Sequence, residues 1–184
     1  MKLRHLLLLF ISFFFVLPLY AEYFKHIGLS EGLTQPSVMA IYQDRLGRMW
    51  FGTKEGISQY DGNRVRIFKG WIKSVGEEPP VWLGNEVSFI VGDSLDNLYF
   101  LIDKNLIKYD IQTEKFSRLT NESIITALTS SEGQVWYMKH DSLFCLKADK
   151  EPTFVLKTNI TSRICCLTMM DDQIGIGTYN GVYL

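Results

Sequence analysis

The chain lacks several features that mark common classes of protein. Its 19 Lys and Arg residues are balanced by 20 Asp and Glu residues, a formal charge of −1, so it has no basic excess to bind a phosphate backbone. Only three cysteines are present among 184 residues, namely Cys145, Cys165 and Cys166. That odd count and spacing fit neither a disulfide framework nor a zinc site. We therefore expect no nucleic-acid partner, no metal and no cofactor.

The three cysteines are interpreted as small buried hydrophobic residues of strands. Cys165 and Cys166 are adjacent, and neighbouring strand residues point to opposite faces, so the pair cannot chelate one metal together. A bridge from Cys145 to one member of the pair remains an alternative in an oxidising compartment.

A long apolar run is found only at the N-terminus. Residues 1–21 combine a basic start, an apolar stretch from Leu6 to Val16, Pro18, and Ala21 before a polar residue. This is the layout of a secretory signal peptide, and the run is short for a membrane span, which needs about 20 apolar residues. We expect cleavage after Ala21 and export of the remaining chain; an uncleaved anchor is the alternative.

A unit of two turns around an aromatic pair recurs along the chain. Residues 38–61 align without gaps to residues 87–110, and weaker copies follow at 124–147 and 164–184. The spacing is close to the period of roughly 40–50 residues that is typical of β-propeller blades. In the first copy, strands are expected at 37–43, 48–53, 56–60 and 64–69.

These copies predict an all-β fold, a β-propeller with about four four-stranded blades. The blades are expected at about 28–70, 85–120, 122–157 and 161–184, the last one incomplete. Regular spacing favours this fold over a β-sandwich. We interpret the chain as a fragment of a larger, seven-bladed propeller. The alternative is a four-bladed ring in which residues 22–27 supply the outermost strand of the last blade.

The repeated residues of the first copy are expected to be structural. Asp44 and Gly47 occupy the first and last positions of a type I turn, and Trp50 and Phe51 are expected to be buried together. Later copies depart from this pattern. Asp96 stands at the position of Gly47, and Ser130 or Ser131 stands where the third copy would have its Asp.

Residues 26–70 resemble the first blade of two-component regulator propellers. The resemblance rests on the lead-in GLSEGLTQPSV, the core D--G--WFGT--G and the turn YDG. It implies the periplasmic sensor region of a hybrid two-component system or sensor histidine kinase of Bacteroides-type bacteria, which commonly recognises oligosaccharides from glycan breakdown. The implied parent is anchored in the inner membrane, and a homodimer of that receptor is a further expected partner. The kinase and DNA-binding parts would lie outside these residues, so this chain is expected not to be an enzyme.

Two groups of residues are candidates for binding a ligand. The connection between the first two blades carries Trp71 and Trp82 on either side of Glu77 and Glu78, and aromatic planes with carboxylates suit a sugar. The alternative is that the tryptophans cover the seam between the blades. The turns between the second and third strands of the blades should form a polar rim, made of Lys54, Glu55, Lys104, Asn105, His140, Asp141, Tyr179 and Asn180.

Two other functions compete with ligand sensing. A propeller lyase or hydrolase of the streptogramin-lyase-like type would use a histidine and carboxylates on this face, and His140 is the available candidate. A pure protein–protein assembly surface is the second alternative.

Overall fold

The computed structural model describes residues 24–72, 81–120, 125–147, 150–170 and 173–184. The expected signal peptide, Glu77 and Glu78 lie outside these residues. Regular structure in the described part is β, apart from one short 3-10 helix, η1 (Leu29–Glu31). None of the helices described there is long and apolar enough to cross a membrane.

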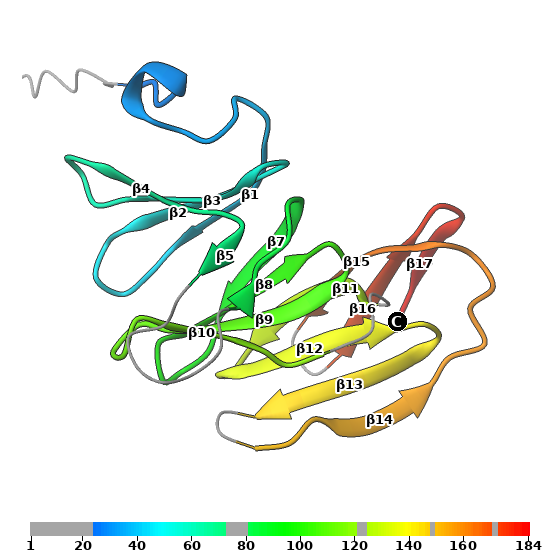
Figure 1. Cartoon of the computed structure of the whole chain (residues 1–184). Coiled ribbons are helices and arrows are strands. Elements are labelled where there is room, and N and C mark those ends of the chain that lie inside the picture. The colour runs from blue at the N-terminus through cyan, green and yellow to red at the C-terminus, as the bar shows by residue number, and fades with distance from the viewer. Residues whose placement is uncertain (1–23, 73–80, 121–124, 148–149, 171–172) are drawn as a thin grey trace, which may run out of the picture.

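Four antiparallel sheets follow one another along the chain, each a simple meander (Figure 1). The first blade consists of β1 (Val38–Gln43), β2 (Met49–Thr53), β3 (Gly56–Tyr60) and β4 (Val65–Phe68). The second consists of β7 (Val87–Gly92), β8 (Asn97–Ile102), β9 (Asn105–Asp110) and β10 (Lys115–Arg118). The third consists of β11 (Ile125–Ser131), β12 (Gln134–Lys139), β13 (Ser142–Lys147) and β14 (Thr153–Lys157). The fourth consists of β15 (Ile164–Met170), β16 (Gln173–Thr178) and β17 (Gly181–Tyr183). A separate hairpin of β5 (Trp71–Ile72) and β6 (Val81–Trp82) joins the first two blades.

The sheets are arranged radially. The first strands of successive blades pack side by side, β1 against β7, β7 against β11, and β11 against β15. Each of these strands is therefore the innermost strand of its blade, next to a common axis. This arrangement confirms the predicted propeller and excludes a β-sandwich, in which two sheets would lie face to face. The expected strands of the first blade are also confirmed to within one residue at each end.

Aromatic side chains fill the seam between the first and second blades. Trp50 is fully buried, and its ring centroid lies 5.1 Å from that of Tyr109, 5.7 Å from Phe100 and 5.8 Å from Phe68. Because Tyr109 and Phe100 belong to the second blade, the seam forms one continuous core. Separate clusters fill the next two seams. The prediction that the repeated aromatic residues are structural is confirmed for Trp50.

Glycine allows the innermost strands to approach one another closely. A Cβ atom on Gly92, at the end of β7, would lie 2.1 Å from the hydroxyl oxygen of Tyr42 in β1. A Cβ atom on Gly52 would lie 2.7 Å from a methyl carbon of Val87. Both contacts cross from the first blade to the second, so these glycines set the distance between the two sheets near the axis.

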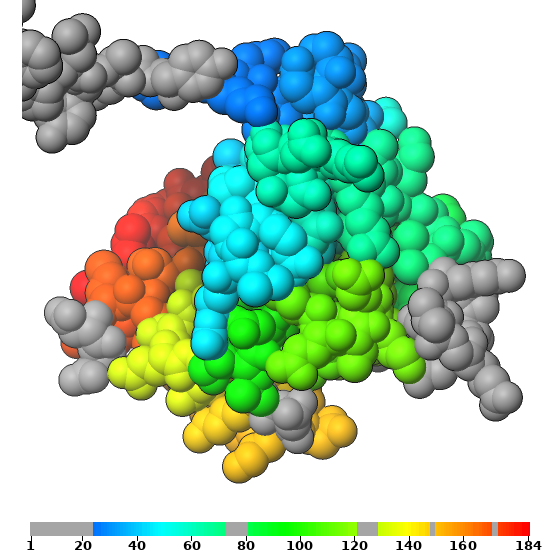
Figure 2. All heavy atoms as spheres, turned by 90° about the vertical axis from the view of Figure 1, so that its left-hand side faces the viewer, coloured from blue at the N-terminus to red at the C-terminus, as the bar shows by residue number. Residues whose placement is uncertain are grey.

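The lead-in before β1 lies on the first blade (Figure 2). Thr34 forms hydrogen bonds with the side chains of Thr53 (2.8 Å) and Ser58 (3.1 Å from the Thr34 amide). Ser58 is the cross-strand partner of Phe51, and paired residues share a face of the sheet, so the lead-in covers the face that carries Phe51. Phe51 is accordingly buried.

Residues 24–27 do not form the outermost strand of the fourth blade. They are not in a strand, and the ammonium group of Lys25 contacts the hydroxyl of Tyr60 in β3 of the first blade. The ring alternative is therefore wrong for the described part of residues 22–27, because this segment is held at the other end of the array. The fourth sheet has three strands, as the incomplete fourth copy predicted.

Candidate functional site

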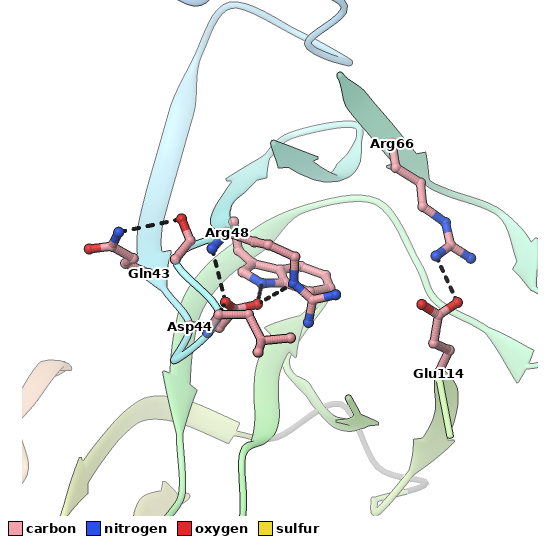
Figure 3. A network of polar contacts seen from close by, with 8 residues as sticks. Gln43, Asp44, Arg48, Arg66 and Glu114 are labelled. Carbon is pink, nitrogen blue, oxygen red and sulfur yellow. Dashed lines mark hydrogen bonds and ion pairs between the residues drawn. The ribbon is translucent and has the colours of Figure 1, made fainter. Parts of the chain in front are cut away.

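The turn between β1 and β2 is built around the carboxylate of Asp44. Asp44 accepts hydrogen bonds from the backbone amides of Leu46 and Arg48, both at 3.0 Å, from Arg48 Nε at 2.7 Å and from Trp50 Nε1 at 2.8 Å (Figure 3). Gly47 closes the predicted turn, since its amide donates to the Asp44 carbonyl oxygen at 2.9 Å and its φ is 79°. Asp44 is buried at 4% exposure, so its carboxylate is part of the scaffold.

The pKa of Asp44 is lower than that of an ordinary aspartate. Burial alone would raise this pKa, but the hydrogen bonds from Trp50 and Arg48, together with the charge of Arg48, outweigh burial and lower it. The folded state therefore favours the ionised form of Asp44.

The second blade repeats this turn with other donors. Asp93 accepts hydrogen bonds from the amide and side chain of Asn97, at 2.9 and 2.8 Å, and from the Tyr99 hydroxyl at 3.0 Å. Asp96, at the position of Gly47, adopts the left-handed conformation with φ of 65°. Arg45 of the first blade pairs with the Asp96 carboxylate at 3.0 Å, which links the two turns.

The third blade uses a shorter turn in place of the aspartate. Ser131 pairs directly with Gln134, and both turn residues, Glu132 and Gly133, have positive φ, as in a two-residue type I′ hairpin. The pair Thr129–Trp136 corresponds to Tyr42–Trp50 of the first blade, so Ser131 stands at the position of Asp44, which is one of the two residues that the sequence alignment offered. The turn that follows Ser131 has one residue fewer than the turn that follows Asp44.

A pocket of about 760 Å³ lies between the second and fourth blades, at the ends of their innermost strands. We call it the central pocket; its described lining is Glu86, Ser88, Phe89, Leu101, Asp103, Lys104, Arg163, Ile164, Cys165 and Tyr179. Because β7 and β15 are the strands nearest the axis, the pocket opens beside the axis on the face that carries the turns between second and third strands.

A recurring β-bulge places two side chains in this pocket. The pairing of the first two strands shifts register at the start of each blade, between Val87 and Phe89 in the second blade and between Ile164 and Cys166 in the fourth. The residues inside these two shifts are Ser88 and Cys165, and both line the central pocket. Bulges redirect side chains in this way at many binding sites.

Asp103 holds the wall of the pocket together. Its carboxylate accepts hydrogen bonds from the amides of Asn85 at 2.9 Å and Glu86 at 3.0 Å, and its own amide donates to the Glu86 carbonyl oxygen at 3.0 Å. Asp103 and Lys104 both have positive φ, which makes the turn between β8 and β9 a tight I′ turn. The turn and the approach to β7 therefore form one rigid corner.

The opposite wall comes from the fourth blade. The Tyr179 amide donates to the Arg163 carbonyl oxygen at 3.2 Å, and the guanidinium carbon of Arg163 lies 5.5 Å from the Tyr179 ring centroid. Tyr179 is 71% exposed, so its ring is available to a ligand. The GT--G turn beneath it is held by Thr178, whose hydroxyl donates to the Gly181 carbonyl oxygen at 2.9 Å and accepts from the Asn180 amide at 3.2 Å.

The structure brings only some of the expected turn residues to this pocket. Lys104 and Tyr179 line it, and Arg163, Glu86 and Phe89 were not anticipated. The remaining expected turn residues are not among its described lining: Lys54, Glu55, Asn105, His140, Asp141 and Asn180. Lys54, Glu55, His140 and Asn180 are exposed at other turns or at the tip of the same turn.

Two of these turn residues have structural contacts. The Asn105 side chain is buried and donates to the Asp103 carbonyl oxygen at 3.0 Å. Asp141 pairs with Lys157 at 3.2 Å and accepts a hydrogen bond from Ser142 at 3.0 Å, and the Lys157 and Ser142 contacts lower the pKa of this carboxyl group. His140 thus stands beside a carboxylate that is already paired, which is not an acid–base arrangement.

Trp71 and Trp82 form a separate aromatic pair on the outer rim. They are cross-strand partners in the hairpin, with ring centroids 5.4 Å apart, and they are 66% and 39% exposed. Arg118 of β10 donates to the Trp82 carbonyl oxygen at 2.6 Å, which fixes the hairpin against the outermost strand of the second blade. Both tryptophans keep exposed surface while their hairpin connects the first two blades, and neither residue is among the described lining of the central pocket.

The cysteines differ from one another in their surroundings. All three are free thiols in the structure; Cys145 is buried, whereas Cys165 and Cys166 are exposed. Burial raises the pKa of the Cys145 thiol. The expectation that all three are buried is therefore correct for Cys145 and wrong for the adjacent pair, because β15 belongs to a blade whose faces are only partly covered.

Comparison with known proteins confirms the family resemblance over the first blade. Residues 32–55 match the family model of the two component regulator propeller. Histidine kinase P4 of Formosa agariphila is 39% identical over 46 residues, which is 25% of this chain and 3% of that protein. The chain thus carries a two component regulator propeller repeat, and it spans only a small part of the curated relative that it matches.

Solved structures share the fold of this chain. The extracellular domain of a hybrid two component system from B. thetaiotaomicron is 22% identical, with a TM-score of 0.68 over 84% of this chain and 24% of that one. The extracellular domain of a one component system from the same organism has a TM-score of 0.63 at 14% identity, covering 86% and 21%. A streptogramin B lyase structure has a TM-score of 0.56 at 19% identity, covering 82% and 55%. These likenesses show that the chain has the β-propeller fold of these structures.

Proposed function

We propose that this chain is the ligand-sensing propeller of a periplasmic sensor region, and that it recognises oligosaccharides in the central pocket. The observation that supports this proposal is the combination of Tyr179 and Phe89 with charged side chains around about 760 Å³ of space. Aromatic faces stack on sugar rings, and charged or polar groups fix the orientation of the hydroxyl groups.

The described lining of the pocket also favours binding over catalysis. His140, the candidate for a lyase or hydrolase, is not among the described lining residues, and its neighbour Asp141 is paired with Lys157. The lyase structures share the fold alone with this chain. A sensor must bind its ligand without converting it, and the described lining residues are groups that can bind a sugar.

Cys165 provides a direct test of ligand binding. It is exposed and lines the central pocket, whereas Cys166 is exposed outside that lining and Cys145 is buried. In a Cys166→Ser variant, alkylation by iodoacetamide should therefore report on the pocket. We expect pooled oligosaccharides to slow the alkylation in a saturable way without appearance of a new sugar product.

The matched control is a Cys165→Ser variant, in which the same pools should leave alkylation of Cys166 unchanged. Equal alkylation rates of Cys165 with and without every pool would refute the proposed site, and release of a sugar product would support the lyase or hydrolase alternative.

Export is tested separately: the mature protein isolated from the periplasm should begin at residue 22, and a protein that keeps its first 21 residues would contradict the expected cleavage.

A further inference from the structure

Two cationic side chains face the central pocket from different blades. Lys104 stands on the turn between β8 and β9 of the second blade, and Arg163 immediately precedes β15 of the fourth. Over the described residues, neither side chain has an ion-pair partner, whereas Arg45, Arg48 and Arg66 each pair with a carboxylate. The sequence separates these two cations by more than a blade, and the fold brings them to one pocket.

The two acidic residues of the described lining, Asp103 and Glu86, differ in how freely their carboxylates can contact a ligand or the two cations. Both carboxylate oxygens of Asp103 are occupied by the amides of Asn85 and Glu86, so Asp103 is committed to the turn. Glu86 is the other carboxylate among the described lining residues, and it is exposed. Among the described lining residues, a ligand therefore meets two cations and two carboxylates, and the carboxylate of Asp103 is the one held by turn amides.

Arg163 is held in a position suited to recognition. Its carbonyl oxygen accepts the Tyr179 amide at 3.2 Å, and its guanidinium lies over the Tyr179 ring at 5.5 Å. A guanidinium group that contacts an aromatic ring in this way keeps N–H donors that match the paired oxygens of a carboxylate or sulfate. An aromatic face and a planar cation therefore lie side by side, as recognition of a charged sugar requires.

We infer that the central pocket selects acidic oligosaccharides, in which Arg163 and Lys104 bind a carboxylate or sulfate group and Glu86 accepts hydrogen bonds from hydroxyl groups. This inference rests on the proposed function, because it concerns the same pocket. A carboxylate offers two oxygens in one plane, and a sulfate group offers three in a tripod. In either case a guanidinium group and an ammonium group can bind the same anion.

Calorimetric titration with three sets of tetrasaccharides tests the inference. The sets are neutral gluco-oligosaccharides, oligogalacturonides that carry carboxylates, and carrageenan oligosaccharides that carry sulfates. We expect saturable binding of at least one acidic set, weaker binding of the neutral set by roughly tenfold or more, and a loss of affinity at raised salt. The acidic set that binds more tightly identifies the anion.

The variants Arg163→Gln and Lys104→Gln should each weaken binding of the acidic set by about tenfold, and by more than they weaken binding of the neutral set. The matched control is Arg66→Gln, because Arg66 is paired with Glu114 on the outside of the first blade, and it should bind like the wild type. Melting temperatures of all three variants establish that they are folded.

The outcomes separate the inference from the proposed function. Equal binding of neutral and acidic sets, or an unchanged affinity in Arg163→Gln, would overturn the selection of acidic sugars and leave sugar sensing intact. If no set protects Cys165 from alkylation and none gives a calorimetric signal, the proposed function and this inference both fall.

Discussion

Replacement of Asp44 by alanine should destabilise the first blade more than any other single change at its turns. The substitution removes the acceptor for the Trp50 indole N–H and for Arg48, along with two turn amides. The amides of Leu46 and Arg48 lie in a partly exposed turn, where water can replace the carboxylate, so they contribute little to the loss.

The remaining two contacts set the magnitude. Trp50 is fully buried, and a buried donor left without an acceptor costs ~1–3 kcal/mol. The hydrogen bond between Arg48 and the charged carboxylate contributes about 1.5–3 kcal/mol, because the Arg48 side chain is only 18% exposed. We expect Asp44→Ala to lower the free energy of unfolding by roughly 3–5 kcal/mol, a large share of the ~5–15 kcal/mol typical of a domain.

Urea unfolding followed by tryptophan fluorescence measures this loss. The matched control is Glu114→Ala, which removes a carboxylate from an ion pair with Arg66 whose side chains are 49% and 52% exposed, and it should cost less than about 1 kcal/mol. A loss in Asp44→Ala no larger than that of the control would refute the structural role of the carboxylate. The repeated turn would then need a functional explanation.

The effect should also depend on pH. The pKa of Asp44 is lowered in the folded state, so its ionised form stabilises the fold. That contribution is complete above the ordinary aspartate pKa of about 3.9 and is lost as the pH falls through the lower folded value. The difference between the wild type and Asp44→Ala should therefore be constant from pH 5 to 8, roughly, and should narrow only below about pH 4. A difference that narrows near neutral pH would contradict this assignment.

Other perturbations test the packing of the blades and the outer rim. Trp50→Ala should cost ~3–5 kcal/mol of unfolding free energy in a urea titration, since the side chain is fully buried in the first seam. Gly92→Ala should cost about 1–3 kcal/mol by contact with Tyr42, and the double change with Tyr42→Ala should cost less than the sum of the two single changes. Trp82→Ala should leave the melting temperature nearly unchanged because Trp82 is 39% exposed. Titration should show weaker oligosaccharide binding by this variant if the hairpin extends the site as predicted. A large fall in stability with unaltered affinity would instead mean that Trp82 acts as a core residue.

The sequence predicted the fold well because a repeat shows which residues belong to the scaffold. Asp44 and Asp93 coincide in the alignment, and each accepts hydrogen bonds from the amide four residues later and from the side chain six residues later. Aromatic residues at the position of Trp50 fill the seams for the same reason. Where the third copy changed its turn length, the same method could not choose between Ser130 and Ser131, because an alignment without gaps cannot place the loss of one turn residue.

The site was less predictable because its residues do not repeat. Arg163 stands outside the repeated turns, and it lines the pocket because the blades are arranged around a common axis. Ser88 and Cys165 enter through β-bulges, and a bulge leaves no reliable signature in a single sequence. Spacing along the chain could place Lys104 and Tyr179 on one face, but it could not show which of the eight turn residues would meet.

The turns suggest how such an array keeps its fold while its ligand face varies. Thr53 and Thr178 hold their GT--G turns by the same two hydrogen bonds, to the glycine carbonyl oxygen and from the amide two residues later. These bonds involve the backbone of the turn and leave its two tip residues free to differ. In the second blade a type I′ turn replaces that frame, and Asp103 ties it to the incoming chain. Since neither frame is held by the side chain of Lys104 or Tyr179, these two residues can be exchanged at small cost in stability. Ligand specificity can then change by substitution at these positions while the blades remain intact.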